Sequence, residues 1–348
     1  MPSPHIWIRH EARATERRAP VVPADVRRLL ASGIHVTVER SPQRIFDIEE
    51  YVEAGAELAD TGSWVDAPDD AYVLGIKELP DEPATLRHRH VYFAHSFKGQ
   101  EDAERTLTRF REGGGRLYDI EYLTDERGRR VVAFGYWAGY VGAALGALRL
   151  AGRLTWPLTP TDKPTLDAQL KDADLPMDTA TVVTGARGRS GTGATDALAV
   201  AGLEAGRWDR AETRARDVSA LLDHDLLVNC VLTTVPTTPF VTADDLPRKR
   251  RLHLISDVTC DVTSATNMVP VNRAITSWDD PVRRVSDDEG HWMDVIAIDN
   301  LPSLVPKEAS QTFSADLTPH LLGLCDSPPV GPWQAAADAY DKALADLP

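Results

Sequence analysis

The chain has 348 residues, of which 43% are hydrophobic and 26% charged, and its formal net charge at pH 7 is −15. This length exceeds one usual hydrophobic core, so two domains are expected, and the composition is that of an ordinary soluble globular protein. The acidic balance argues against nucleic acid as a partner, because phosphate backbones need a basic face, but it leaves room for an anionic substrate held by a local basic cluster.

The first third of the chain alternates between strand-like and helix-like segments. Strands separated by helices of this length predict right-handed crossovers and a parallel sheet. The expected strands are 34–39, 71–77, 90–96 and 116–123, and the expected helices are 24–33, 47–56 and 101–115.

The stretch 131–148 carries no charge and is long enough to span a bilayer. Its glycines recur at helical spacing on one face, which suits close approach of another backbone in a membrane or in a buried core. Arginines flank the stretch on both sides and polar segments follow it. We therefore predict a buried central helix and no membrane span.

The segment 153–180 contains four prolines and no clean period, which is typical of a linker or a loosely built excursion. A second alternating region follows it. Its expected strands are 179–185, 206–209, 226–232, 251–258 and 292–299, and its expected helices are 194–205 and the C-terminal 332–347.

Three cysteines, Cys230, Cys260 and Cys325, are too few and too widely spaced for a disulfide framework or a zinc site. They indicate a reducing cytoplasm. The N-terminal residues 1–18 have no apolar core of the signal-peptide type.

A glycine-rich turn lies between the expected strand 179–185 and the helix that follows. It carries Gly185, Gly188, Gly191 and Gly193. Glycines here permit a tight turn and close approach of the backbone to a pyrophosphate, while the helix N-terminus favours its negative charge. The pattern predicts dinucleotide binding.

Asp209 ends the next expected strand, 24 residues after Gly185. A carboxylate near this spacing accepts hydrogen bonds from an adenosine ribose and disfavours a 2′-phosphate, which predicts NAD as the cofactor. Arg210 follows directly and keeps NADP open as an alternative.

Ionisable residues follow several strands of the first region. Lys77 and Glu78 come at the end of one strand, His95 and Lys98 at the end of the next, and Glu121 near the end of a third. Ligands of open parallel sheets bind outside the carboxyl ends of the strands. A lysine with a carboxylate beside it, together with a histidine, can supply an acid–base pair tuned near neutral pH.

Three arginines are candidates for holding substrate carboxylates, because a guanidinium fork matches a carboxylate. They are Arg18 near the N-terminus and Arg129 with Arg130 before the glycine-rich helix, and Arg18 could equally be surface charge. The RHRH run at 87–90 has no third ligand at a sensible interval, so we interpret it as a solvated turn and expect no metal site.

Together these residues resemble the NAD-dependent, L-lysine-forming saccharopine dehydrogenases of the alanine dehydrogenase and transhydrogenase superfamily. The likeness covers nearly the whole chain, and its specific part is the combination of KELP, FAHSFK and GRRVVAFG. The glycine fingerprint is less specific. The segments that carry the resemblance are GIKELP, FAHSFKGQ, GRRVVAFG, GARGRSGTGA, SDVTCD and IDNLPSLVPKEAS.

The resemblance implies an α/β fold of two Rossmann-like domains with parallel sheets and an active-site cleft between them. Residues 1–132 with 318–348 would form the substrate-binding and catalytic domain, and 133–317 the dinucleotide-binding domain. The implied reaction is reversible oxidative cleavage of saccharopine, with NAD, to L-lysine and 2-oxoglutarate. Hydride would leave the carbon that bears the secondary amine, and water would hydrolyse the resulting imine.

By the same resemblance, Lys77 and His95 match the acid–base pair, and Glu78 and Glu121 match carboxylates that tune it. Substrate positions would be Arg18, Lys98, Arg129, Arg130 and Phe134. Cofactor positions would be Gly185, Gly188, Arg189, Gly191, Asp209, Arg210, Asp257, Asp299 and Leu301.

Two other functions remain open at the level of sequence. One is an opine- or alanine-dehydrogenase-like enzyme that uses another amine donor and 2-oxo acid. The other is a binding protein that keeps the dinucleotide fold without catalysis, against which Lys77 and His95 argue. We expect a cytoplasmic enzyme of lysine metabolism, a monomer or weak homo-oligomer, with no nucleic-acid or membrane partner.

Overall fold

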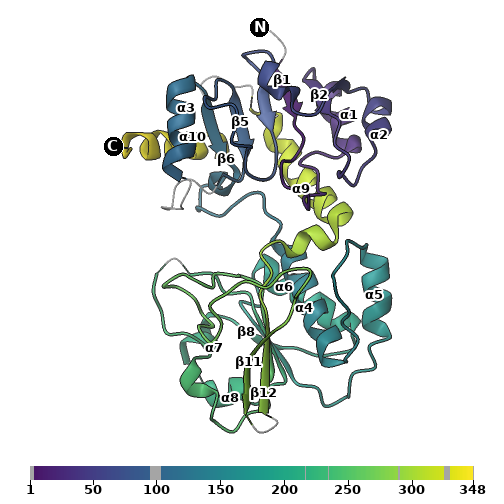
Figure 1. Cartoon of the computed structure of the whole chain (residues 1–348), viewed down its shortest axis with the longest axis vertical. Coiled ribbons are helices and arrows are strands. Elements are labelled where there is room, and N and C mark those ends of the chain that lie inside the picture. The colour runs from purple at the N-terminus through teal and green to yellow at the C-terminus, as the bar shows by residue number, and fades with distance from the viewer. Residues whose placement is uncertain are drawn as a thin grey trace. The chain divides into compact units, whose positions relative to one another are not determined.

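The computed structural model describes residues 4–94, 103–215, 217–233, 235–288, 291–324 and 330–347. The chain divides into two compact units, Met1–Ala133 with Pro306–Pro348 (unit 1) and Phe134–Val305 (unit 2). In the described residues each unit holds one six-stranded sheet with helices around it (Figure 1). The predicted α/β class with two Rossmann-like units is confirmed.

The sheet of unit 1 has the strand order β3-β2-β1-β4-β5-β6, and every neighbouring pair is parallel. The sequence predicted neither the central strand β1 nor the edge strand β3, because β1 leads directly into a run of charged residues and β3 contains no apolar run. The strands are β1 (His5–Ile8), β2 (His35–Glu39), β3 (Glu57–Ala59), β4 (Tyr72–Leu74), β5 (Arg89–Tyr92) and β6 (Arg116–Asp119).

Strand β1 lies between β2 and β4, so the chain builds one side of the sheet first and then crosses to the other. This reversal is a topological switch point, where ligands of open α/β sheets bind. The register aligns the strand ends on its β4 side, since Leu74 lies opposite both Ile8 and Val91, and Tyr92 lies opposite Asp119. Residues that follow β1, β4, β5 and β6 therefore leave the sheet at one edge.

Helix α9 (Pro306–Leu321) returns to unit 1 and packs on its N-terminal segment. The hydroxyls of Ser310 and Ser314 accept hydrogen bonds from the amides of Ala19 and Val22. The expected domain limit at residue 318 falls inside this helix. The other helices of unit 1 are α1 (Pro23–Ala31), α2 (Ile48–Glu53), α3 (Ala103–Gly113), α10 (Pro332–Ala345), η1 (Ser63–Asp66) and η2 (Ile120–Tyr122).

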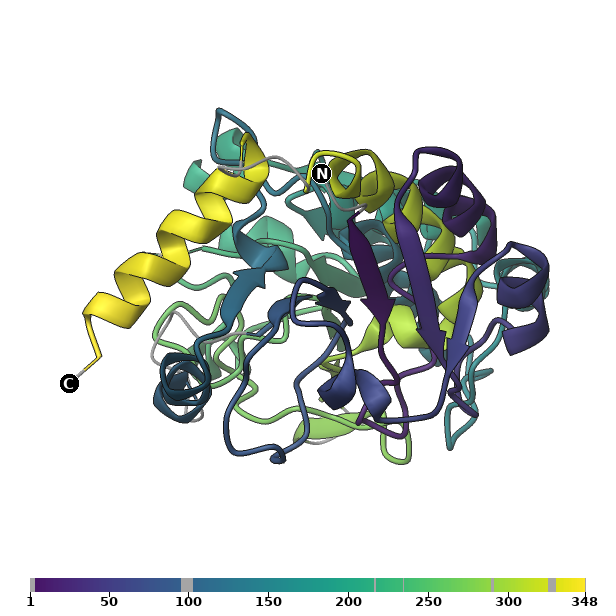
Figure 2. The same cartoon turned by 90° about the horizontal axis from the view of Figure 1, so that it is seen from above.

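Helix α10 covers the outer strand of this sheet (Figure 2). Arg116 of β6 forms an ion pair with Asp341 at 2.6 Å, and the Tyr340 ring joins the buried cluster around Phe110. The predicted C-terminal amphipathic helix is confirmed.

The interpretation of residues 87–90 as a solvated turn was wrong. His88 and His90 are 1% and 0% exposed; His88 directly precedes β5, and His90 is its second residue. The His90 ring packs edge-on against Trp64 and Phe110, and burial lowers its pKa well below the usual value. A neutral imidazole can act as a core aromatic ring, which composition alone could not indicate.

The sheet of unit 2 has the order β11-β12-β10-β9-β7-β8, parallel except for the β11–β12 pair. Strand β7 lies between β8 and β9, so this sheet also has a topological switch point. The strands are β7 (Thr181–Thr184), β8 (Gly206–Trp208), β9 (Leu226–Asn229), β10 (Leu254–Asp257), β11 (Arg283–Asp288) and β12 (His291–Ile296).

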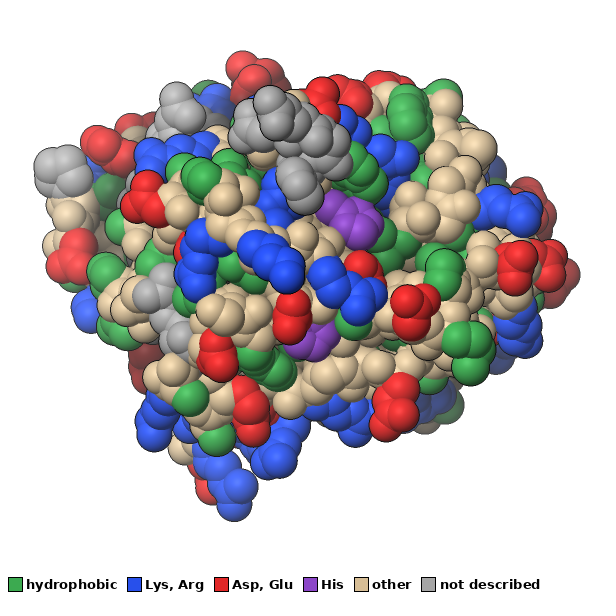
Figure 3. Space-filling model, turned by 90° about the horizontal axis from the view of Figure 1, so that it is seen from below, with side chains coloured by type: hydrophobic (Ala, Val, Ile, Leu, Met, Phe, Trp, Pro, Cys, Tyr) green, Lys and Arg blue, Asp and Glu red, His purple; other side chains and the backbone are tan. Residues whose placement is uncertain are grey.

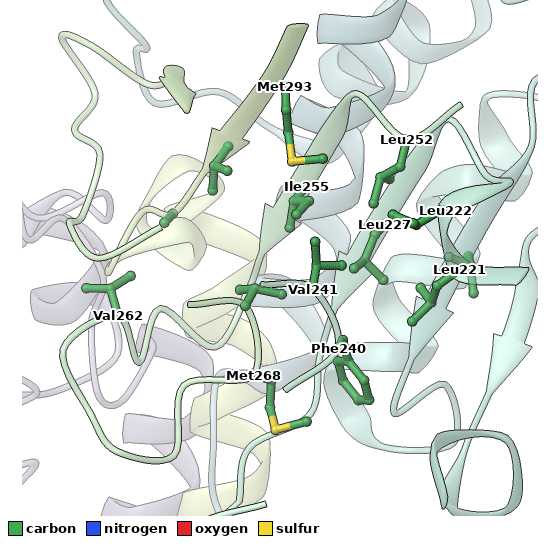
Figure 4. Close-up of a cluster of buried hydrophobic side chains, with 14 residues drawn as sticks. Leu221, Leu222, Leu227, Phe240, Val241, Leu252, Ile255, Val262, Met268 and Met293 are labelled. Carbon is green, nitrogen blue, oxygen red and sulfur yellow. The ribbon is translucent and has the colours of Figure 1, made fainter. Parts of the chain in front are cut away.

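A core of aliphatic side chains and methionines covers one face of this sheet (Figure 4). Leu227 of β9 and Ile255 of β10 meet Phe240 and Met268 from the segments that follow these strands. Four short helices of unit 2 are α7 (Arg210–Ala215), α8 (Val218–Leu222), η3 (Ala243–Asp245) and η4 (Leu301–Leu304).

The segment predicted as a linker contains helix α5 (Lys163–Lys171). Asp162 caps it by accepting a hydrogen bond from the Thr165 amide, and Pro164 occupies its first turn. Leu166 and Leu170 bury one side of the helix. Proline in a first turn is compatible with a helix, so the prolines of this segment were given too much weight as helix breakers.

Helix α4 (Gly135–Leu150) is the buried helix that the uncharged stretch predicted, and it packs on α6 (Arg189–Val200). A β-carbon at Gly139 would lie 1.7 Å from the Ser190 carbonyl oxygen, and one at Gly193 would lie 2.0 Å from that of Tyr136. Only glycine permits this backbone contact. Across the described residues, no helix combines the length and the apolar character that crossing a membrane requires.

We expect Gly139→Ala to destabilise unit 2, because its β-carbon would meet the α6 backbone. Alanine ordinarily favours a helix by about 1 kcal/mol over glycine, whereas this overlap should lower the free energy of unfolding by about 1–3 kcal/mol. Gly146→Ala is the matched control in the same helix, since its β-carbon would meet only the flexible end of Leu226 at 3.1 Å. Denaturant unfolding of both variants measures the difference, and equal stability would contradict the packing argument.

Candidate active site

Lys77 lies beyond the strand that was expected to contain it. Strand β4 ends at Leu74, and Lys77 is half-buried in a turn at the switch-point edge of the unit 1 sheet. Glu78, the next residue, is exposed. His95 and Lys98, which follow β5 in the chain, lie outside the described residues.

Two buried charged residues after β1 hold the main chain of this turn. The Glu11 carboxylate accepts hydrogen bonds from the amides of Ile76 (2.7 Å) and Lys77 (3.0 Å). The Arg9 guanidinium donates to the Lys77 carbonyl and forms an ion pair with Glu11 at 3.3 Å. Burial raises the pKa of the Glu11 carboxyl, although the charge of Arg9 opposes the shift.

Glu16 and Arg18 form a second buried pair. The Arg18 guanidinium donates to both Glu16 oxygens, at 2.8 and 2.6 Å. Glu16 is 1% exposed and Arg18 is 4% exposed. Burial works to raise the pKa of Glu16, but the charge and hydrogen bonds of Arg18, with a smaller contribution from Lys77, hold it below the usual value. Arg18 therefore favours the charged form of Glu16.

Glu78 forms an exposed ion pair with Arg13, at 2.8 Å. The side chains are 52% and 36% exposed. The predicted role of Glu78 beside the acid–base pair remains a prediction, and its partner Arg13 was not among the predicted site residues.

Glu121 leaves the end of β6 in the short helix η2. Its buried carboxylate forms an ion pair with Arg130 at 2.7 Å. The neighbouring Arg129 points to solvent, 70% exposed, and pairs with Asp125. The structure thus distinguishes two adjacent arginines that the sequence could not. Phe134 is half-buried at the N-terminus of α4 and belongs to unit 2.

Three residues of this edge were missed from the sequence: Arg9, Glu11 and Glu16. The available signal was an unusual density of charge directly after β1, in a segment that the structure buries. Without β1 the segment was read as surface, so its charges carried no structural meaning.

The glycine turn of unit 2 follows β7 at the second switch point. Gly185 has φ +68°, and a β-carbon at Gly191 would lie 2.1 Å from the Gly185 carbonyl oxygen. Gly188 is the N-cap of α6, which begins at Arg189. The close turn and the helix N-terminus form a cradle that fits a pyrophosphate.

Asp209 follows β8, next to this turn in the sheet order. One carboxylate oxygen accepts a hydrogen bond from the Arg210 amide (2.8 Å), and the other lies 3.8 Å from the Arg187 Nε. Arg187 is 89% exposed and can move aside for a ligand. It was not among the predicted cofactor residues.

Asp257 ends β10 and is 1% exposed. Its Oδ1 accepts hydrogen bonds from Asn229 Nδ2 (2.9 Å) and the Thr259 hydroxyl (2.8 Å), and burial raises its pKa. Asn229 in turn accepts from the Thr184 hydroxyl, so the chain of hydrogen bonds fixes the ends of β7, β9 and β10. Asp257 thus helps to fix the strand ends next to the glycine turn.

Asp299 and Leu301 lie in the segment after β12. Asp299 is exposed, whereas Leu301 is 1% exposed at the start of η4 and packs against Gly142 of α4. On the face drawn in Figure 3, basic and acidic side chains lie next to one another.

Comparisons with known proteins match the N-terminal part of the chain to one family model and the whole chain to several relatives. The family model for the alanine dehydrogenase/PNT N-terminal domain matches residues 7–141. A saccharopine dehydrogenase (NAD+, L-lysine-forming) of Emericella nidulans is 39% identical over 374 residues, covering 100% of this chain and 99% of its own. That of Neurospora crassa is 40% identical and covers 99% and 97%. Among solved structures, an L-alanine dehydrogenase has a TM-score of 0.69 at 18% identity, covering 99% of this chain and 94% of its own, which shows a shared fold.

We expect Glu16→Gln to lower the free energy of unfolding at pH 7 by about 3 kcal/mol, because it leaves the buried Arg18 charge uncompensated. The folded pKa of Glu16 is depressed, so its contribution is present above the unfolded pKa and is lost as pH falls through the folded pKa. The difference between parent and variant should therefore shrink on acidification below about pH 4.

The matched control for this measurement is Glu78→Gln. Its ion pair with Arg13 is exposed, so its loss should change the unfolding free energy by less than about 1 kcal/mol. Denaturant unfolding at several pH values tests both variants. A Glu16→Gln effect as small as the control, or one that grows in acid, would contradict the buried-pair argument.

Proposed function

The chain belongs to the family of NAD-dependent, L-lysine-forming saccharopine dehydrogenases, and we propose that it catalyses the reversible oxidative cleavage of saccharopine to L-lysine and 2-oxoglutarate with NAD. The observation that carries the proposal is the placement of Lys77, on a turn held at the unit 1 switch point and within the field of the buried Glu16 carboxylate. The chain also matches its relatives over their full length.

The residues of unit 2 fit NAD. Gly185 and Gly191 leave room for the pyrophosphate, the α6 N-terminus favours its charge, and the Asp209 carboxylate can accept hydrogen bonds from the adenosine ribose. The bound cofactor supplies an acceptor for the hydride that leaves the substrate.

The balanced reaction converts saccharopine, water and NAD+ to L-lysine, 2-oxoglutarate, NADH and a proton. Hydride leaves the glutarate carbon that carries the secondary amine, and an imine forms between this carbon and the lysine nitrogen. Water adds to the imine carbon, and the C–N bond then breaks. Each of the last two steps moves a proton, so the site needs one group that accepts protons and one that donates them.

Lys77 and His95 fill these two roles in the proposal. Glu16, buried and ionised, provides the counter-charge for the protonated state of Lys77. The Glu121–Arg130 pair, at the end of β6, offers a guanidinium for a substrate carboxylate and a carboxylate that tunes nearby protonation. Glu16 holds the Arg18 guanidinium in one orientation, and this orientation sets the direction from which a substrate carboxylate can bind it.

A substrate panel tests the reaction. With NADH, we expect L-lysine and 2-oxoglutarate to give much faster NADH loss than ammonia with pyruvate or with 2-oxoglutarate. The physical reason is that the proposed site recognises a large substrate with several carboxylates, and a small amine forgoes most of that binding energy. Absorbance of NADH measures each rate, and the proposal fails if ammonia with pyruvate is the fastest pair.

Asp209→Ala should raise the KM for NAD by about tenfold to a hundredfold, since it removes a charged acceptor of ribose hydrogen bonds. The preference for NAD over NADP should fall at the same time. Glu204→Ala, at an exposed position just before β8, is the control and should leave both values unchanged. Steady-state kinetics with both cofactors measures the effect, and an unchanged preference would remove Asp209 from the cofactor site.

A further inference from the structure

The turn that carries Lys77 continues the backbone hydrogen-bond pattern of the sheet only on its β5 side. On the β5 side, ordinary backbone hydrogen bonds continue past β4, from Gly75 to Val91 and from Phe93 to Ile76. On the β1 side, the last backbone bond runs from the Arg9 amide to the Leu74 carbonyl.

Beyond that bond, two side chains replace the missing strand. Glu11 accepts from the amides of Ile76 and Lys77, and Arg9 donates to the Lys77 carbonyl. The amide and the carbonyl of Lys77 are thus both bound by buried side chains. Glu11, which is 4% exposed, binds the amide, and Arg9, which is 1% exposed, binds the carbonyl.

We propose that Arg9 and Glu11 are positioning residues for the reaction, which act by clamping the main chain of Lys77 and so fix the point from which its side chain extends. We call the two side chains the Arg9–Glu11 clamp. The inference rests on the proposed function, because it assigns a role to the clamp through Lys77.

The clamp has little freedom to move. The Arg9 guanidinium crosses directly over Gly75, where a β-carbon would lie 2.4 Å from Nε. Its carbon Cζ lies 5.7 Å from the centre of the Tyr92 ring, and Arg44 donates to the Arg9 carbonyl at 3.1 Å. Gly75 is therefore needed by the path of Arg9.

The charges of the clamp also suit a positioning role. Arg9 and Glu11 neutralise each other at 3.3 Å, so they fix the Lys77 backbone without adding net charge to the site. Glu11 satisfies two amides with two acceptor oxygens. A glutamine would replace one of these oxygens by an NH2 group that faces an amide donor. Glu11→Gln should therefore lose one of the two hydrogen bonds that Glu11 accepts from the turn.

A displacement of the Lys77 backbone by about 1 Å is enough to cost about a hundredfold in rate when the side chain must meet a reacting atom. We expect Arg9→Lys, which keeps the charge but loses the fork, to lower kcat by roughly tenfold to a hundredfold. The KM for NAD should not change, because the residues proposed to bind NAD lie in unit 2.

The matched control is Arg109→Lys. Arg109 is also buried in unit 1, at 7% exposure, and its fork also holds a backbone carbonyl, that of Pro83. The Arg109 fork binds the Pro83 carbonyl and not the main chain of Lys77, so kcat should remain within about twofold of the parent while stability falls as in Arg9→Lys. Thermal unfolding compares the two variants.

The deciding experiment is a double-mutant cycle of Arg9→Lys with Lys77→Met on the full chain, assayed with saccharopine and NAD. If Arg9 acts through Lys77, Lys77→Met alone lowers kcat strongly, and adding Arg9→Lys then lowers it little further. The pH profile of kcat should also shift in Arg9→Lys and not in Arg109→Lys, because only Arg9 contacts the main chain of Lys77 and so affects the surroundings of its ammonium. Should Arg9→Lys fail to fold, Gly75→Ala displaces the guanidinium without removing it and enters the same cycle.

Two results would overturn the inference alone. One is multiplicative loss in the double variant, which means that Arg9 acts independently of Lys77. The other is an Arg9→Lys enzyme that matches Arg109→Lys in kcat and pH profile. A Lys77→Met enzyme as active as the parent would instead overturn the acid–base assignment of the proposed function, and the clamp would then lose its catalytic purpose.

Discussion

Both candidate sites form at the end of a parallel sheet, where the hydrogen bonds between neighbouring strands stop. At each switch point the neighbouring strands diverge, and the backbone that leaves them needs new hydrogen-bond partners. Unit 1 meets this constraint with large buried side chains, since Arg9 and Glu11 bind the peptide groups that a strand would have bound. Unit 2 meets it by leaving side chains out, since Gly185 and Gly191 bring backbone against backbone. In the proposed function, the first arrangement carries Lys77 and the second would hold the pyrophosphate of NAD.

The charge at the unit 1 edge is organised as ion pairs. Composition suggested a local basic cluster within an acidic protein, but Arg9, Arg18 and Arg130 each bind a carboxylate. Such a site offers guanidinium groups in fixed orientations and little net charge. Selection among anionic substrates would then depend on where the forks point, because a nearly neutral cluster attracts anions only weakly at a distance.

The predictable part of the fold was the part with a strong local period. The parallel strands with long apolar runs, the glycine-face helix and the nucleotide turn were all recognisable, because their signals lie within a few residues. Strand β1 and helix α5 were not, since the charged segment that follows β1 was read as surface and the prolines around α5 were read as helix breakers. The histidines of the RHRH run were misread because their burial depends on Trp64 and Phe110, which lie elsewhere in the chain.

The site was predictable to the same degree and for the same reason. Lys77 was predicted because it follows an apolar strand and because of the family resemblance, but the residues that bind its main chain come from the segment after β1, which the sequence did not reveal. Gly75 illustrates the limit most clearly. Locally it resembles a glycine that ends a strand, and its φ is not in the left-handed region. Its requirement comes from the Arg9 guanidinium, which lies 66 positions earlier in the sequence and passes through the volume a β-carbon would fill. A glycine two residues before Lys77 is thus part of the lysine's support, and only the three-dimensional path of an arginine shows it.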